Sequence, residues 1–202
     1  EFDFMVPIGS ILKFIAPEMK MPYLQEEFLK ADPLMMKDFR TAYHRSENSK
    51  PLVGLSWRGG GGKKSRVEAK SLALSNLLKP ILDLPCDFIS LQYGDCKDYV
   101  LHTQKKINRP IIYDTSVNAI KDMDRWLAQV GICDYVISVA NTTVHGSGGL
   151  GIPTFCLVPK SHDWRWIRAD KGYRNSYWYS SVDAVIQKDA KDWNPELKAM
   201  RN

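Results

Sequence analysis

Three polar residues, Asn141-Thr142-Thr143, interrupt a long apolar stretch, and their types suit the start of a helix that holds an anion. The run before them, residues 135–139, is almost continuously apolar, as in a parallel strand covered on both faces. Residues 154–158 form a second such run. Asn and Thr cap helix N-termini, where unpaired backbone N–H groups favour negative charge. The stretch therefore predicts a strand, a turn, a short helix and a second strand, with phosphate groups bound at the turn.

A plainer interpretation of this stretch stays open. A helix cap and a phosphate use the same N–H groups, so residues 141–143 could be a cap alone. His145 would lie about one turn into the helix, where it either contacts a ribose or phosphate or serves the structure. Residues 146–151 match G-x-G-x-x-G, but a dinucleotide motif must follow its strand directly and open a long helix. Neither condition holds here, so we interpret these glycines as positions where the short helix packs closely on the sheet.

A second candidate is the glycine-rich basic loop at residues 58–64, which follows the apolar run 51–57. It is not a P-loop, because Lys64 stands where Ser or Thr is required and Trp57 stands in place of the first glycine. We expect a cationic flap that neutralises a diphosphate leaving group; a solvated loop is the alternative. The flap would bring several residues to the molecule that carries this diphosphate, the nucleotide-activated donor. These residues are Trp57, Arg58, Gly59, Lys63, Lys64 and Arg66.

A third candidate is the aromatic, charged segment Asp163-Trp164-Arg165-Trp166. Its indole rings and its arginine could close over a sugar or phosphate, which makes Asp163 and Trp164 candidate donor contacts. The alternative is a hydrophobic plug with a surface ion pair.

The elements that must position these residues alternate along the chain. The pattern predicts strands at 51–57, 86–91, 110–113, 135–139, 154–158 and 181–187, with helices at 66–84, around 99–101 and at 121–130. Such alternation indicates an α/β fold, a Rossmann-like, doubly wound parallel sheet. Right-handed crossovers would place all the polar loops on one rim, where ligands bind. We expect a helical lead or interdomain segment over 1–49, with a helix starting at Asp32-Pro33, a Rossmann-like domain over 50–193 and a tail helix over 194–202.

Composition argues against several other classes. The chain has 202 residues, a net charge of +5 and 44% hydrophobic residues. The largest basic cluster, residues 63–66, is too short to indicate nucleic-acid binding. No apolar run reaches the roughly 20 residues of a membrane helix, and the N-terminus does not resemble a signal peptide. Four cysteines without a C-x-x-C pair predict reduced core thiols in a cytoplasmic protein. Scattered histidines and unpaired carboxylates give no metal pattern.

Several motifs occur together in an order that resembles a known family. The motifs span nearly the whole chain. In their sequence and order, they resemble the C-terminal, donor-binding half of the GT-B glycosyltransferases often fused to tetratricopeptide repeats. These are similar to O-linked N-acetylglucosamine transferases and, more distantly, to the heptosyltransferases of lipopolysaccharide synthesis. The segments that carry the resemblance are 54–60, 64–66, 90–95, 134–151, 163–166, 178–179 and 192–193.

The resemblance implies one half of a GT-B fold that binds a nucleotide-diphospho-sugar as donor, with no essential metal or other cofactor. Thr142 and Thr143 would match the diphosphate-binding helix start, and Lys63 or Lys64 the cation that assists departure of the nucleoside diphosphate. Gln92 lies where the family often contacts the base. His145 matches a frequent histidine of that helix. The acceptor, protein or glycan, and the general base would belong to an N-terminal Rossmann domain that packs against this one.

Two departures from the family pattern keep a second hypothesis in view. Ala140 stands where relatives often carry Asp, and residues 146–149 replace a Leu-Ala-Gly-Ala sequence. The first hypothesis is therefore a glycosyltransferase donor domain. The second is a non-catalytic module that binds nucleotides or phosphosugars within a larger assembly.

Overall fold

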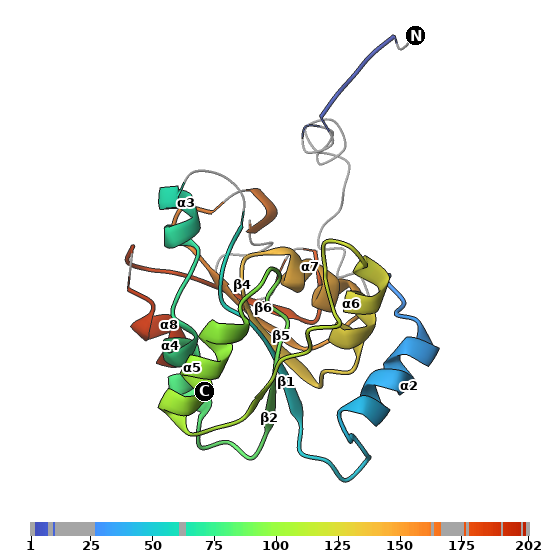
Figure 1. The fold of residues 1–202 in the computed structure, drawn as a ribbon. Coiled ribbons are helices and arrows are strands. Elements are labelled where there is room, and N and C mark those ends of the chain that lie inside the picture. Colours follow the sequence, from blue (N-terminus) through green and yellow to red (C-terminus); the bar gives the residue numbers. More distant parts are fainter. Residues whose placement is uncertain are drawn as a thin grey trace.

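A computed structural model describes residues 3–7, 10, 27–60, 64–162, 164–166, 176, 178–190, 192–198 and 200, with the backbone alone at 64–66 and 164. Its centre is a six-stranded sheet in which all neighbouring strands are parallel, in the order β3-β2-β1-β4-β5-β6 (Figure 1). The strands are β1 (Leu52–Ser56), β2 (Asp87–Ser90), β3 (Ile111–Ile112), β4 (Tyr135–Val139), β5 (Thr154–Val158) and β6 (Val182–Ile186). The predicted Rossmann-like, doubly wound α/β fold is confirmed.

Burial on both faces explains why the apolar runs become strands. All five residues of β1 are buried, as are four of the five in β4. Parallel strands covered by helices on both sides need apolar side chains at every position. In the register of the sheet, Gly54 lies between Ile89 of β2 and Val136 of β4. The four strands that have a neighbour on both sides are β2, β1, β4 and β5.

Helices cover both faces of the sheet (Figure 1). On one face α2 (Pro33–Ala42) packs against α6 (Met123–Gly131). The other carries α4 (Leu74–Leu78), the 3-10 turn η1 (Lys79–Ile81), α5 (Lys97–Ile107) and α8 (Asn194–Lys198). At the carboxyl ends of the strands are α3 (Lys64–Ala69), α7 (Thr142–Gly149) and the 3-10 turn η2 (Trp164–Trp166).

Two predicted helix boundaries bear on the domain plan. Asp32 caps α2, because its carboxylate accepts hydrogen bonds from the backbone N–H groups of Leu34 and Met35, and Pro33 occupies the first turn. The predicted start of that helix is confirmed; residues 8–9 and 11–26 of the lead lie outside the described residues. α8 lies within the predicted tail and packs through Leu197 onto the core. The domain boundaries themselves stay predictions.

The single helix predicted over residues 66–84 is wrong. It is divided into α3, α4 and η1, and residues 70–73 leave the helical path. The backbone N–H of Leu72 donates to the carbonyl of Trp57, 3.0 Å away, and the Ser71 hydroxyl accepts a bond from the N–H of Gly59 at 3.1 Å. These contacts draw the segment back to the end of β1, so that α3 lies apart from α4.

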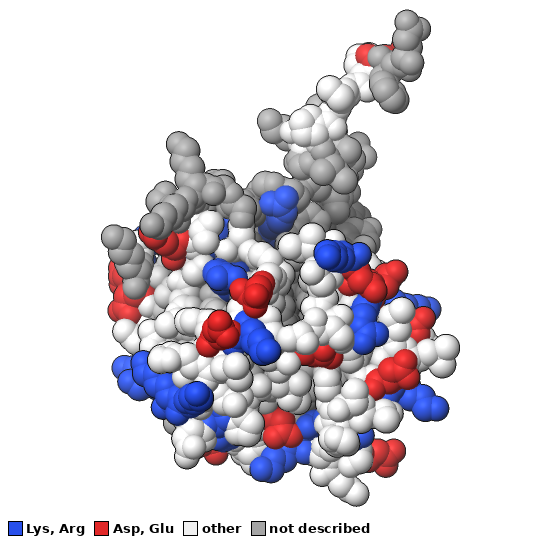
Figure 2. Space-filling model, in the orientation of Figure 1, with Lys and Arg blue, Asp and Glu red and all other residues white. Residues whose placement is uncertain are grey.

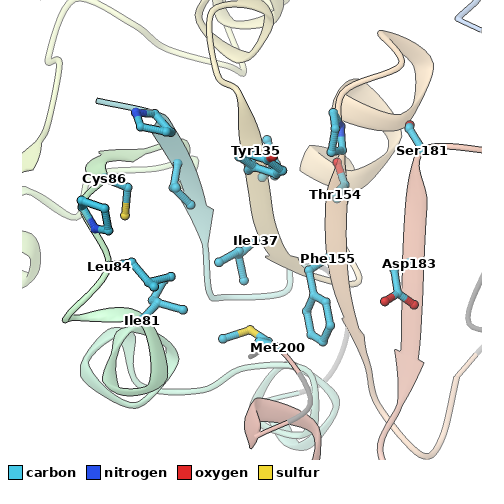
Figure 3. A pocket seen from close by; sticks show the side chains of 15 residues that line it. Ile81, Leu84, Cys86, Tyr135, Ile137, Thr154, Phe155, Ser181, Asp183 and Met200 are labelled. Atoms are coloured by element: carbon cyan, nitrogen blue, oxygen red, sulfur yellow. The ribbon is translucent and has the colours of Figure 1, made fainter. Parts of the chain in front are cut away.

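A large cavity lies at the amino ends of the strands, opposite the polar loops (Figure 3). We call it the amino-edge cavity; it measures about 530 Å³ and is lined by residues 51, 53, 81, 84–86, 135–137, 153–155, 181, 183 and 200. Its walls are mostly apolar, with Phe155 and Met200 lying side by side beneath Ile137 (Figure 3).

All four cysteines are buried free thiols, as predicted. Within the described residues, no helix has the length and apolar character needed to cross a membrane.

Candidate functional site

The order of the strands reverses between β1 and β4, which are neighbours in space but far apart in sequence. In open α/β sheets, ligands bind at such a reversal, outside the carboxyl ends of the strands. Here the loops after β1, β2, β3 and β4 meet at that edge. The predicted polar rim is therefore assembled, and it contains the start of α7.

Asn141 fixes the start of α7 against the ends of two strands. Its side-chain oxygen accepts bonds from the N–H of Thr143 at 2.9 Å and from the hydroxyl of Ser138 at 3.0 Å. Its amide nitrogen donates to the hydroxyl of Ser56 at 2.7 Å and to the carbonyl of Arg58 at 3.2 Å. Asn141 is thus the helix cap and also ties α7 to the loop after β1. The first N–H of the helix, that of Thr142, has no acceptor inside the helix and is available to an anion.

On the other side of β1, the Gln92 side chain makes a similar connection to the loop after β1. Its side-chain oxygen accepts bonds from the N–H groups of Trp57 at 3.0 Å and Arg58 at 2.8 Å, and its nitrogen donates to the Arg58 carbonyl at 3.2 Å. The side chain is only 6% exposed, so the structure gives it a positioning role for the loop. The Trp57 indole is buried and stacks on Tyr99. Contact of Gln92 with a base, and of Trp57 with a donor, stay predictions.

Three adjoining hollows lie along this edge, and Tyr93 lines all of them. The α7 hollow, about 290 Å³, is lined by Gly60, Tyr93, Ala140, Asn141 and Thr142. The apolar hollow, about 370 Å³, is lined by residues 91, 93, 119, 120, 123, 126, 142 and 143. The polar hollow, about 290 Å³, is lined by residues 90–95, 97, 113–115, 117–120, 126 and 129. Together they offer an anion-binding end, an apolar middle and a polar end.

His145 lies in α7 as predicted, and its ring is held between two aromatic side chains. Its Nδ1 is 2.8 Å from the hydroxyl of Tyr179, and the imidazole stacks on Trp166 with ring centroids 5.6 Å apart. Burial raises the pKa of the Tyr179 hydroxyl, which keeps it protonated at neutral pH. Either the hydroxyl or Nδ1–H donates in this contact, according to the tautomer of the imidazole. The segment 164–166 and the approach to β6 therefore meet at α7.

The glycines of α7 are sites of close packing, as predicted, but most of the atoms near them belong to neighbouring helices and loops and not to the sheet. A Cβ at Gly146 would lie 2.8 Å from the Trp126 ring, and one at Gly148 would lie 2.6 Å from the Tyr179 ring. The helix is thus pressed between α6 and the segment before β6. This confirms a packing role for these glycines.

A hydrogen-bond network joins α2 to the loop that follows β3. The Tyr43 hydroxyl donates to the Asp114 carboxylate at 2.7 Å and accepts from the Gln129 amide at 2.7 Å. Burial raises the pKa of Tyr43 well above its ordinary value, and the bond to Asp114 adds to the shift. Burial also pushes the pKa of Asp114 upward, but hydrogen bonds from Ser116 and Tyr43 outweigh it and the net pKa is lowered. Asp114 and Gln129 both line the polar hollow, so the network sets its far wall.

The structure does not describe every predicted site residue. Lys63 and Asp163 lie outside the described residues; Lys64 and Arg66 belong to the backbone of α3, and Trp164 to that of η2. The residues that it brings together are Arg58, Gly59, Gln92, Asn141, Thr142 and Thr143, with His145 one turn along α7.

Several residues of the site were not singled out from the sequence. Tyr93 and Tyr179 are the main examples, together with the exposed apolar residues Ile120 and Met123 beside the apolar hollow. Tyr93 had a usable signal, because it follows Gln92 in a loop at the carboxyl end of a strand. The contact of Tyr179 with His145 spans 34 positions of sequence and had none.

The other groups that could attract a ligand to this edge are charged side chains and metal-binding side chains. Among the described residues, no group of three His, Cys, Asp or Glu side chains could hold a metal ion. On the face in Figure 2, basic and acidic side chains of the described residues are interspersed. The described part of the site therefore offers an anion the start of α7, together with Lys97 in the polar hollow and the Arg58 guanidinium beside Gly94.

Comparisons with known proteins agree with this architecture. No family model matches the chain. Protein FlbA of Caulobacter vibrioides is 27% identical over 201 residues, which span 97% of this chain and 32% of that protein. The structure of E. coli ADP-heptose lps heptosyltransferase II aligns with 88% of this chain and 49% of its own, with a TM-score of 0.51 and 14% identity. A family 9 glycosyl transferase from Veillonella parvula aligns with a TM-score of 0.49 and 12% identity, over 88% of this chain and 46% of its own.

The comparison with the heptosyltransferase supports the fold. At 14% identity, the likeness to the heptosyltransferase is a likeness of architecture, and it agrees with the Rossmann-like sheet described above. The chain spans about a third of FlbA and about half of the heptosyltransferase.

Proposed function

We propose that this chain binds a nucleotide-diphospho-sugar and forms the donor-binding half of a glycosyltransferase. The observation that carries the proposal is the start of α7, where the Thr142 N–H borders a hollow at the reversal between β1 and β4. The diphosphate would lie at this helix start, with Asn141 holding the helix in place. The nucleoside would extend along the adjoining hollows.

Catalysis in this proposal is electrostatic and needs no metal. The helix start and Lys63 or Lys64 would stabilise the negative charge that develops on the β-phosphate as the glycosyl bond breaks. The acceptor, a protein or a glycan, and the base that activates it would belong to a second Rossmann domain. The match to about half of a heptosyltransferase supports such a partner domain. Membership of the tetratricopeptide-repeat-associated group and a cytoplasmic location are parts of the same proposal.

A backbone substitution tests the binding claim. Proline is favoured at the first position of a helix, and Asn141 already has the extended conformation that precedes proline (φ −145°, ψ −172°). Thr142→Pro should therefore keep α7 folded but remove the N–H that the helix start offers to the diphosphate. By calorimetry, we expect affinity for the best of UDP, ADP, GDP and CDP to fall by about tenfold or more, the cost of a lost charged hydrogen bond.

The matched control is Thr142→Ala, which keeps the N–H and removes only the side-chain hydroxyl. It should bind the same nucleotide more tightly than Thr142→Pro. The binding claim fails if the unmodified chain binds none of the four nucleoside diphosphates or their sugars. It also fails if Thr142→Pro binds as tightly as Thr142→Ala.

The alternative is a module that binds the same ligand without transferring sugar. Ala140 favours it, because this side chain borders the α7 hollow and offers no charged or polar group there. Donor hydrolysis or transfer by the full-length protein, lowered in a Lys63→Ala/Lys64→Ala double variant, would support the enzyme. Binding without either reaction would support the module.

A further inference from the structure

Tyr93 occupies a position that no other described residue of the edge shares. It lines the α7 hollow, the apolar hollow and the polar hollow, and the first two share only Thr142 besides it. A ring in this place lies between the anion-binding α7 hollow and the apolar and polar hollows that adjoin it. Its position therefore determines what can extend from the diphosphate.

The backbone around Tyr93 is held on one side by its neighbour. Gln92 is buried and bonded to the backbone of Trp57 and Arg58, so the loop after β2 is tied to the loop after β1 immediately before Tyr93. The Tyr93 side chain begins at a fixed point and reaches across the edge toward Gly60.

The ring can lie there only because residue 60 has no side chain. A Cβ at Gly60 would lie 1.9 Å from the Tyr93 hydroxyl oxygen and 2.8 Å from Cζ. No real Cβ contact is that short, so any other residue at position 60 must displace the ring. Gly60 and Tyr93 thus form a matched pair across two loops that are 33 positions apart in sequence.

The chemistry of the apolar hollow indicates what lies against this ring. Leu91, Ile120, Met123 and Trp126 give it apolar walls, while Thr142 and Thr143 connect it to the start of α7. A planar base or a ribose that extends from a diphosphate at Thr142 would enter between these walls and the Tyr93 ring. Stacking on an aromatic ring is a main source of affinity for bases.

We propose that Tyr93, held in place by Gly60, is the residue that determines binding of the nucleoside part of the donor. This inference rests on the proposed function and adds a separation of roles: α7 binds the diphosphate, and the Tyr93 ring binds what is attached to it. The ring carries the effect, and the hydroxyl does not.

The test compares two probes on one set of variants. The probes are inorganic pyrophosphate and whichever of UDP, ADP, GDP and CDP the unmodified chain binds best, both measured by calorimetry. Tyr93→Ala should weaken the nucleoside diphosphate by about tenfold while leaving pyrophosphate unchanged. Tyr93→Phe should bind both as the unmodified chain does. Tyr135→Ala, which removes a half-exposed tyrosine at the opposite edge of the sheet, should change neither.

Gly60→Ala provides an independent check, because it displaces the ring without altering it. It should weaken nucleoside diphosphate binding, and the Tyr93→Phe background should lessen that effect by removing the atom in closest conflict. If the unmodified chain binds no nucleoside diphosphate, the proposed function fails and this inference fails with it. If it binds one and Tyr93→Ala retains that affinity, or loses pyrophosphate equally, the inference alone is overturned.

Discussion

The two ends of the sheet carry hollows of opposite character. The amino-edge cavity, at about 530 Å³, is larger than each of the three hollows at the carboxyl edge, yet its walls are mostly apolar (Figure 3). The hollows at the carboxyl edge are smaller, at about 290 to 370 Å³, but they join the start of α7 to polar side chains from several loops. Volume and chemistry therefore point to different ends.

The direction of the strands explains the difference. In a parallel sheet with right-handed crossovers, helices begin near the carboxyl ends of strands and end near the amino ends. N–H groups and partial positive charge gather at the first edge, and carbonyl groups at the second. The helix ends therefore favour a phosphate at the carboxyl edge. The amino-edge cavity is better explained as a gap in packing between η1 and the end of α8 than as a second phosphate site.

The largest predicted effect tests whether the carboxyl edge is organised by Gln92. In Gln92→Leu, the N–H of Trp57 loses its acceptor in a buried position, and the N–H of Arg58 loses its acceptor in a partly buried one. An unsatisfied buried donor costs about 1–3 kcal/mol, so we expect about 3 kcal/mol of lost stability, measured by urea unfolding. Nucleotide binding should fall as well, because the loop after β1 is released.

A second buried glutamine provides the control for this variant. Gln187 follows β6, is 3% exposed, and accepts one backbone bond, from the N–H of Lys160 at 3.3 Å. Gln187→Leu should cost less than Gln92→Leu and leave nucleotide binding unchanged. Equal losses of stability and binding in the two variants would show that Gln92 has no special place at the edge.

The next effect tests the amino edge. Phe155 contributes a partly buried ring to the amino-edge cavity, beside Met200 (Figure 3). Phe155→Ala would enlarge the cavity, and we expect a loss of about 2 kcal/mol, below the range for fully buried aromatic residues. Nucleoside diphosphate affinity should not change. A fall in that affinity, with the variant still folded at the assay temperature, would show that the amino-edge cavity contributes to nucleotide binding.

The sequence predicted more at the backbone level than at the level of side-chain contacts. All six strands of the described sheet were predicted, and the apolar runs of β1 and β4 were the clearest, because strands buried on both faces need no partner information to be recognised. The start of α7 was equally clear, because the Asn141 side chain caps the helix by bonding the N–H of Thr143, only two residues along the chain. These features depend on residues that are close together in the chain.

The missed features all depend on residues far apart. The break after α3 arises because residues 71 and 72 bond to the end of β1, which helical periodicity does not reveal. The bonds from Gln92 to residues 34 to 36 positions earlier were not foreseen, and its contact with a base stays a prediction. The fit of Tyr93 against Gly60 likewise exists only after both loops have reached the same edge.

The smallest effect concerns the wall of the polar hollow and depends on pH. Tyr43→Phe removes one hydroxyl that bonds both Asp114 and Gln129, and we expect a loss of about 1 kcal/mol at pH 7. The lowered pKa of Asp114 means that its contribution is present above the ordinary carboxyl value of 3.8 and disappears as the pH falls through the folded-state pKa. The raised pKa of Tyr43 means that its contribution is present below the ordinary value of 10.0 and is lost above it.

The difference in stability between the unmodified chain and Tyr43→Phe should therefore be constant at neutral pH and shrink toward both extremes. Urea unfolding of both proteins at about pH 3, 7 and 10.5 measures it. Thr41→Ser, on the same helix but outside this network, controls for general effects on α2. A difference that does not vary with pH would show that the Tyr43 hydroxyl contributes packing alone. The α2 segment would then adjoin the carboxyl edge without being coupled to the ionisation of Asp114 in its wall.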